Sequence, residues 1–207
     1  MLTIITKATT AALTTLEAVK ADLGIVGDDE DATLSTLIGQ ASASLLSGIG
    51  RSLVRETLRE TFRLTQPVVS LVLSRFPVAT VDRISVDNGA PLDAGTFELD
   101  PAAGMLSRLD AAGRYQRWPA AVVVVDYKAG YLLPGQEGRD LPDDIEGAAL
   151  ALVRRAYHQT GRNPLLKGMD VGGGAIKLDW FVPTANAGGM PPEVAAVVER
   201  YSQPTIG

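Results

Sequence analysis

The run of three glycines at residues 172–174 is the first stretch of this sequence that could bind a ligand. Glycine-rich loops hold phosphates when they follow a strand, open a helix and end in Lys followed by Ser or Thr. Here Lys177 comes three residues after the last glycine, a leucine follows it, and the pattern is that of a strand. The dinucleotide pattern G-x-G-x-x-G also fails, because it too must open a helix. We therefore expect Gly172, Gly173 and Gly174 to form a hinge or an adaptable contact loop, since glycine adopts conformations that other residues avoid.

An acidic cluster at residues 28–31 is a candidate for metal binding. A calcium loop needs alternating ligands, a central glycine and a distal glutamate, and "DDEDATLSTLIG" lacks that arrangement. Acids that precede a helix stabilise its N-terminus without any metal. We interpret the cluster in this way and predict no metal site.

The remaining candidates for catalysis are few. His158 is the only histidine and there is no cysteine, which excludes most catalytic triads and zinc sites. We expect His158 to be solvated or to interact with a helix C-terminus. The sequence therefore predicts no enzyme, no catalytic residue and no cofactor.

Charged residues alternate between positions 55 and 63. Arg55, Arg59 and Arg63 share one parity, whereas Glu56 and Glu60 interrupt the apolar parity. The glutamates could be an acid/base pair, but structural ion pairs are the simpler account. The arginines form either a solvated face with glutamate partners or a surface that pairs with acids of a neighbouring subunit.

Helical patterns flank these candidates on both sides. Residues 14–50 predict a helical hairpin after a short leader, with a capping box at Thr14 and Glu17 and a first stop at Gly24. Residues 142–202 predict two further helices that flank the glycine run and a brief strand. Val194, Val198 and Tyr201 fall on one side of the last helix.

Residues 52–131 have the patterns of strands. The clearest is "AAVVVVDYKAGY" at residues 120–131, a buried strand is expected at 68–73, and a strand–turn–strand unit at 97–110. The dipeptide Asn88-Gly89 predicts a hairpin turn. The fold class is thus α+β, a small bundle of about four helices with an inserted antiparallel β block, in one domain over residues 1–207.

The net charge of −5 argues against a surface built to grip nucleic acid. No apolar run approaches the roughly 18 residues of a membrane helix, and the first residues lack the pattern of a signal peptide. We expect no membrane association.

The order of these patterns resembles the head–tail connector (adaptor) proteins of tailed phages and related prophage or gene-transfer particles. "TLEAVKADLGI" followed by "GDDEDATLSTLIGQASASL" is similar to the helix, Asp-rich turn and long second helix that open that family. "LVLSRFPVATVDRISVDNG", "VVVVDYKAGY" and "LPDDIEGAALALVRRAYHQTG" resemble its longer subgroup, which carries a β insertion. The resemblance covers residues 14–201, and the order and spacing of the motifs carry its specificity.

The resemblance implies a structural role. Such adaptors form a homo-oligomeric ring, usually of twelve copies, between the portal and the next neck or tail-terminator component. Double-stranded DNA passes through the channel without sequence-specific binding. The implied location is the neck of the virion, with assembly in the host cytoplasm. Mapped onto this chain, the portal contact comprises Gly172, Gly173, Gly174, Trp180, Phe181, Val194, Val198 and Tyr201, and the contact between subunits comprises Arg55, Arg59, Arg63, Glu56 and Glu60.

Two alternatives remain open at this point. The chain could be another neck or tail-completion protein, which would bind a tail tube and ignore the portal. It could also be a metal-dependent hydrolase, in which case substitution of Asp28 or Asp31 would abolish metal-dependent turnover.

Overall fold

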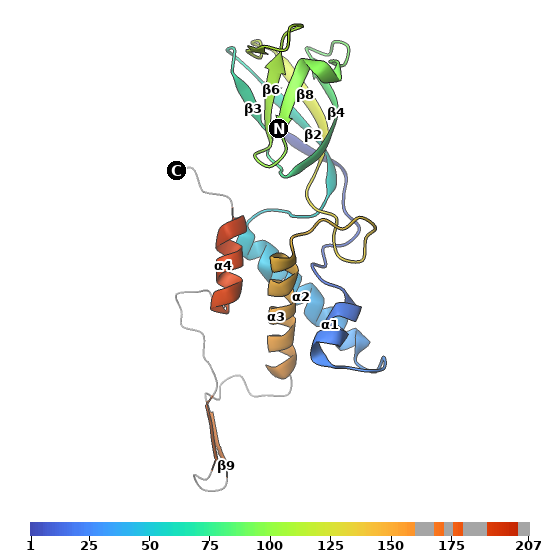
Figure 1. Ribbon diagram of the computed structural model, residues 1–207, viewed down its shortest axis with the longest axis vertical. Coiled ribbons are helices and arrows are strands. Elements are labelled where there is room, and N and C mark those ends of the chain that lie inside the picture. Colours follow the sequence, from blue (N-terminus) through green and yellow to red (C-terminus); the bar gives the residue numbers. More distant parts are fainter. Residues whose placement is uncertain (160–167, 172–175, 180–189, 203–207) are drawn as a thin grey trace. The chain divides into compact units, whose positions relative to one another are not determined.

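The computed structural model describes residues 1–159, 168–171, 176–179 and 190–202. It confirms the α+β class, with helices and antiparallel sheets in one chain (Figure 1). The chain divides into two compact units. One, the β unit, comprises residues 1–10 and 52–140, and the other, the helical unit, comprises residues 11–51 and 141–207. The helical unit is therefore discontinuous in sequence, with most of the β unit inserted between its halves.

The β unit contains two four-stranded sheets. The first has the order β1-β2-β8-β4 and is antiparallel throughout. The second has the order β3-β6-β5, and β7 also pairs with β6. The strands and one short helix are β1 (Leu2–Thr6), β2 (Glu56–Arg63), β3 (Ser70–Val72), β4 (Val78–Val86), η1 (Ala94–Thr96), β5 (Phe97–Asp100), β6 (Met105–Leu109), β7 (Tyr115–Gln116) and β8 (Val122–Ala129).

One hydrophobic core serves both sheets. Alternate residues of β8, such as Val123 and Val125, are completely buried, as the period of a strand requires. They pack in one cluster with Leu71 of β3, Leu106 of β6 and Trp118, whose indole N–H donates to the Leu106 carbonyl at 3.2 Å. The predicted strands at 120–131 and 97–110 are thereby confirmed.

Three expectations for the β unit need correction. The N-terminal residues, expected as a leader, form β1 and cover the edge of β2. The predicted Asn88-Gly89 turn is centred one residue earlier, because Asp87 and Asn88 have the positive φ angles (49° and 59°) and Gly89 N–H donates to the Val86 carbonyl at 2.8 Å. This turn does not join neighbouring strands, since β4 pairs with β8. The strand expected at 68–73 is limited to β3.

The helical unit is built on α1 (Leu16–Leu23), α2 (Asp31–Ile49), α3 (Asp143–Gln159) and α4 (Pro192–Tyr201). The helix α1 ends at Gly24 and α2 at Gly50, both in the left-handed conformation. The predicted cap of α1 was displaced by one residue: the side chain of Thr15, not Thr14, accepts the hydrogen bond, from the Ala18 N–H at 3.1 Å. Thr14 is buried and its hydroxyl donates to Glu146 Oε1 on α3 at 3.3 Å.

The core of the helical unit lies among α1, α2 and α3. Val19, Leu34, Ile38 and Val153 are buried together there. The helix α4 packs against both α2 and α3, and Figure 1 shows α1 and α4 on opposite sides of those two helices. The unit also contains a short antiparallel pair, β9 (Gly168–Val171) and β10 (Ile176–Asp179). The sequence pattern predicted β10 but not β9.

Candidate functional site

Five of the residues expected at the portal contact lie outside the described residues: Gly172, Gly173, Gly174, Trp180 and Phe181. The neighbouring strands β9 and β10 are paired antiparallel, with Val171 opposite Ile176. The role of the five residues therefore stays a prediction.

The other three residues expected at the portal contact belong to α4, which packs against α2 and α3 of the same chain. Val194 is completely buried, and Val198 and Tyr201 are half-buried. The Tyr201 hydroxyl donates to Asp144 of α3 at 2.9 Å, and Arg200 donates to the same carboxylate at 2.8 Å. A contact through Val194 would thus require α4 to leave its place.

The close fit between α4 and α2 depends on Gly48. A Cβ atom at that position would lie 3.2 Å from the terminal methyl group of Met190 and 3.3 Å from the Val198 methyl groups. Arg51, just beyond α2, adds a hydrogen bond from Nε to the Tyr201 carbonyl at 3.0 Å. The position of α4 is therefore set by both helices that it packs against.

The outer face of the first sheet carries two of the alternating arginines, Arg59 and Arg63 of β2, whereas Arg55 precedes the strand. Arg59 of β2 bonds the neighbouring Asp126 of β8 through two nitrogens, at 2.6 and 2.8 Å. Arg83 of β4 lies on the other side of Asp126 in the sheet register. The hydrogen bonds from Arg59 lower the pKa of Asp126 despite its partial burial, and the charge of Arg83 contributes.

A hollow of about 200 Å³ lies over this part of the sheet. It is lined by Arg59, Thr61, Arg83, Ser85, Asn88, Val124 and Asp126. With two guanidinium groups and one carboxylate, the hollow has a local charge of about +1, which suits an acidic group. The sequence pattern indicated Arg59 and Arg83 as cations for a contact with acids but not Asp126, because strand pairing alone brings the three residues together.

The other arginines of the alternating run differ from Arg59. Arg55 is tied down within the β unit by an ion pair with Asp140 and by a bond from Nε to the Gly130 carbonyl at 3.0 Å. Arg63, at the end of β2, is exposed. The ion-pair partners found for Arg55 and Arg59 are aspartates, so the expectation of glutamate partners was wrong.

Glu56 and Glu60 face the interior of the β unit. They are 8% and 4% exposed. The carboxylate of Glu60 accepts hydrogen bonds from the Ser74 N–H at 2.9 Å, from the Ser74 hydroxyl, and from the Tyr127 hydroxyl at 2.9 Å. In this conformation Glu60 is a buried charge satisfied by neutral donors, which is a structural role.

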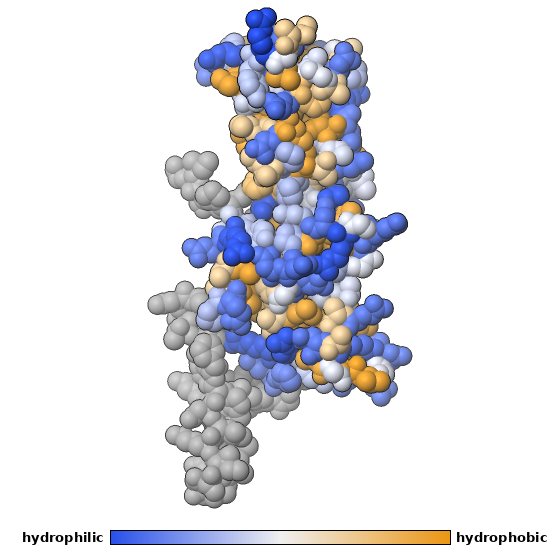
Figure 2. Space-filling model, in the orientation of Figure 1, coloured by the Kyte–Doolittle hydropathy of each residue, from blue (hydrophilic) through white to orange (hydrophobic). Residues whose placement is uncertain are grey.

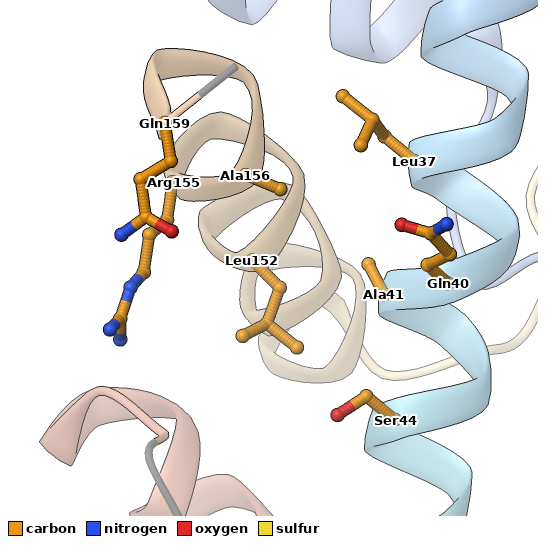
Figure 3. Close-up of a pocket in the computed structure, with 8 residues that line it drawn as sticks. All are labelled: Leu37, Gln40, Ala41, Ser44, Leu152, Arg155, Ala156 and Gln159. Atoms are coloured by element: carbon orange, nitrogen blue, oxygen red, sulfur yellow. The ribbon is translucent and has the colours of Figure 1, made fainter. Parts of the chain in front are cut away.

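A shallow groove of about 300 Å³ runs between α2 and α3. Figure 3 shows its lining, which is apolar at the centre and carries amide, hydroxyl and guanidinium groups at the margin. Its lining residues are Leu37, Gln40, Ala41 and Ser44 of α2 with Leu152, Arg155, Ala156 and Gln159 of α3. We call it the α2–α3 groove. The side chains that line it include one cation and no acid, so it is suited to an apolar group with acidic neighbours.

Two acids of the cluster at residues 28–31, Asp28 and Asp31, form ion pairs with Lys20 of α1. Lys20 Nζ lies 2.9 Å from Asp28 Oδ1 and 2.5 Å from Asp31 Oδ1, and the hydrogen bonds with these two groups raise the pKa of Lys20. Glu30 is the N-cap residue of α2 but makes no side-chain capping bond. Within the described ranges, no group of three or more acids or histidines could hold a metal ion. No helix in those ranges is long and apolar enough to cross a membrane.

Comparison with known proteins gives a family for most of the chain. The family described as "Head completion protein" matches residues 12–203, which include parts of both units. No curated protein matches the sequence.

Solved structures share the fold. Chains in "Neck of empty GTA particle computed with C6 symmetry", "Virion of native gene transfer agent (GTA) particle" and "Neck of native GTA particle computed with C12 symmetry" superpose with TM-scores of 0.57, 0.56 and 0.53. They are 20%, 20% and 21% identical to this chain, and each match covers 100% of it and 97% of the other chain. At this identity the likeness concerns the fold.

Proposed function

The chain belongs to the head completion protein family, and on that premise we propose that it forms a ring beneath the portal and extends the DNA channel toward the tail. The match over residues 12–203 carries this proposal, because it spans the helical unit and the β unit together. The role is structural: the protein joins head to tail and catalyses no reaction.

We propose a ring of twelve copies, located in the neck of the virion and assembled in the host cytoplasm. The related fold in GTA necks, for which symmetries of C6 and C12 are given, supports a ring. Each copy has a net charge of −5, so twelve copies would repel the DNA that passes and would not retain it. The partners are the portal on one side and a neck or tail-terminator protein on the other.

The two expected contacts map onto different units. The portal contact is assigned to the C-terminal part of the helical unit, residues 172–174, 180–181 and α4. The contact between neighbouring copies is assigned in part to the outer face of the first sheet, where Arg59, Arg63 and Arg83 can meet a carboxylate of the next copy. Glu56 and Glu60 support this face from the interior.

Assembly with the portal protein tests the proposal. Purified protein mixed with its portal should give a ring on the portal that electron microscopy resolves. The double variant R59A/R83A should weaken ring formation about tenfold or more, since it removes the cations that line the hollow. Arg114 is the matched control, because its side chain is 81% exposed and lies outside the hollow. If the wild-type protein associates with the portal under no assembly condition, the proposed function is wrong.

A further inference from the structure

The connection between α1 and α2 presents a hydrophobic side chain to solvent. Val26 is 98% exposed, whereas its neighbour Ile25 packs against the core of the helical unit. Gly24 and Gly27 flank these two residues with φ angles of 68° and 93°, which turn the chain sharply at this point. Figure 2 shows hydrophobic surface at the outer end of this connection, with hydrophilic surface around it. At this exposure nearly the whole apolar surface of the Val26 side chain is available for contact with another chain.

The α2–α3 groove has the complementary properties. Its centre is formed by leucine and alanine side chains, and Arg155 stands at its margin (Figure 3). Near Val26 the chain carries the exposed Asp29 and also Asp28, whose side chain is 90% exposed although it pairs with Lys20. An apolar residue followed by two acids therefore matches an apolar groove with a cation at its margin.

We infer that Val26 of one copy sits in the α2–α3 groove of the next copy, with Asp28 and Asp29 near Arg155. Figure 1 shows the α1–α2 connection at the N-terminal end of α2, and Glu30 at the end of this connection hydrogen-bonds with Tyr157 of α3. Val26 is not among the residues that line the groove, so the contact joins two different surfaces of the helical unit and is head-to-tail. Head-to-tail contacts close into rings when the rotation between copies permits it. The inference rests on the proposed ring and adds a contact made by the helical unit to the one assigned to the β unit.

Cysteine cross-linking tests the contact directly, because the natural chain has no cysteine. In the variant V26C/S44C, one thiol replaces Val26 and the other lies in the groove. After ring assembly and mild oxidation, we expect covalent oligomers up to the full ring on a non-reducing gel. The single variants V26C and S44C should give at most dimers.

The matched control is V26C/A43C. Ala43 precedes Ser44 in α2 and is likewise a small, exposed residue, but it does not line the groove. If rings form and V26C/S44C yields no more covalent oligomer than V26C/A43C, the inference is overturned while the proposed function stands. A disulfide between the thiol at position 44 and the portal would likewise overturn the inference and leave the proposed function standing. If wild-type protein forms no ring, both proposals fail.

The variant V26D tests whether ring assembly requires this contact. V26D should reduce ring formation at least tenfold while the melting temperature stays the same, because the side chain touches little in the isolated chain. V69D is its control, since Val69 is a 60% exposed valine of the β unit. Equal ring formation by V26D and wild type would overturn the inference.

Discussion

At the scale of single residues, Glu60 and Tyr127 are the most tightly constrained polar pair of the β unit. Tyr127 is completely buried, and its hydroxyl donates to Glu60 at 2.9 Å. Burial raises the pKa of Tyr127, and the charge and hydrogen bond of Glu60 raise it further, against a smaller opposite effect of Arg75. Both effects favour the neutral phenol, because a phenolate would be a second negative charge beside a buried carboxylate.

This pair predicts a loss of stability at high pH. The unfolded chain releases the proton of Tyr127 near pH 10, whereas the folded chain keeps it. The free energy of unfolding should therefore fall above about pH 10, by up to about 1.4 kcal/mol per pH unit. Urea unfolding between pH 8 and pH 11 measures this slope.

The variant Y127F is the control for that slope. It should cost about 1.5–3 kcal/mol at pH 7, through the lost hydrogen bond to the Glu60 carboxylate, and should reduce the slope above pH 10. Hydrogen bonds with Glu98 and Glu30 raise the pKa values of Tyr115 and Tyr157, so the difference between wild type and Y127F is the informative quantity. Identical slopes for the two proteins would show that Tyr127 is not the group responsible.

The sequence predicts part of this arrangement and misses the rest. The alternation in β2 assigns Glu60 to the apolar parity, and Glu60 is indeed buried. Nothing in the sequence identifies its donors, because Ser74 and Tyr127 lie 14 and 67 residues away: Tyr127 meets Glu60 through the pairing of β2 with β8, and Ser74 meets it from the bend after β3. The same limit applies to the pairing of Arg83 with Asp126, which depends on strand register.

At the scale of elements, α4 is the part whose position matters most for the proposed portal contact. It is a helix of ten residues, too short to be stable alone, and one fully buried residue, Val194, anchors it. A side chain on α2 at Gly48 would press against α4, because an added Cβ would lie 3.2 Å from the Met190 methyl group and 3.3 Å from those of Val198.

Gly48 therefore offers a way to release α4. In G48V, the added side chain would meet Met190 and Val198, so α4 should be displaced while α2, which gains helix propensity, persists. We expect the amides of α4 to exchange with deuterium at least tenfold faster, with the amides of β8 unchanged. G39V is the matched control, because Gly39 also lies in α2 and has nothing within 4 Å of the same added atom. Equal exchange of α4 in both variants would argue that Gly48 does not set its position.

Prediction of the elements depended on the length and regularity of each pattern. The helix α2 spans 19 residues and β8 has a regular alternation, and both are predicted correctly. The strand β1 is only five residues long, and four of them are exposed, so it has no alternation to detect. It is stabilised by pairing with β2, which is a long-range interaction. The turn lies at Asp87 and Asn88, one residue before the predicted Asn88-Gly89, because Asp and Asn both tolerate positive φ.

At the scale of the whole molecule, the β unit depends on a segment from the far N-terminus. The Met1 amino group donates to the Thr61 carbonyl at 2.8 Å, and the Thr61 N–H donates to the Met1 carbonyl at 2.8 Å. Leu2 packs against the core between the two sheets. The first strand thus completes a sheet whose other members come after residue 55.

Deletion of residues 1–7 should therefore destabilise the β unit selectively. We expect its melting temperature to fall by about 5 °C or more, because β2 loses its ladder partner and the core loses Leu2. Hydrogen exchange should rise in β2 and change little in α2. The double variant I4T/I5T is the control, since both side chains are exposed and the backbone ladder remains. A fall of the same size in the control would assign the effect to side chains and not to strand pairing.

The order of strands also determines when the chain can fold during its synthesis. The strand β8 lies between β2 and β4 in the first sheet, yet it is the last of the four to leave the ribosome. Until residue 129 has emerged, β2 and β4 have no partner between them, and α1 and α2 must wait longer still for α3. A nascent chain halted before β8 would leave β4 without its partner strand and one edge of β2 unpaired, and unpaired edges are prone to aggregation. Folding of both units is therefore expected to be late, with the β unit waiting for β8 and the helical unit for α3.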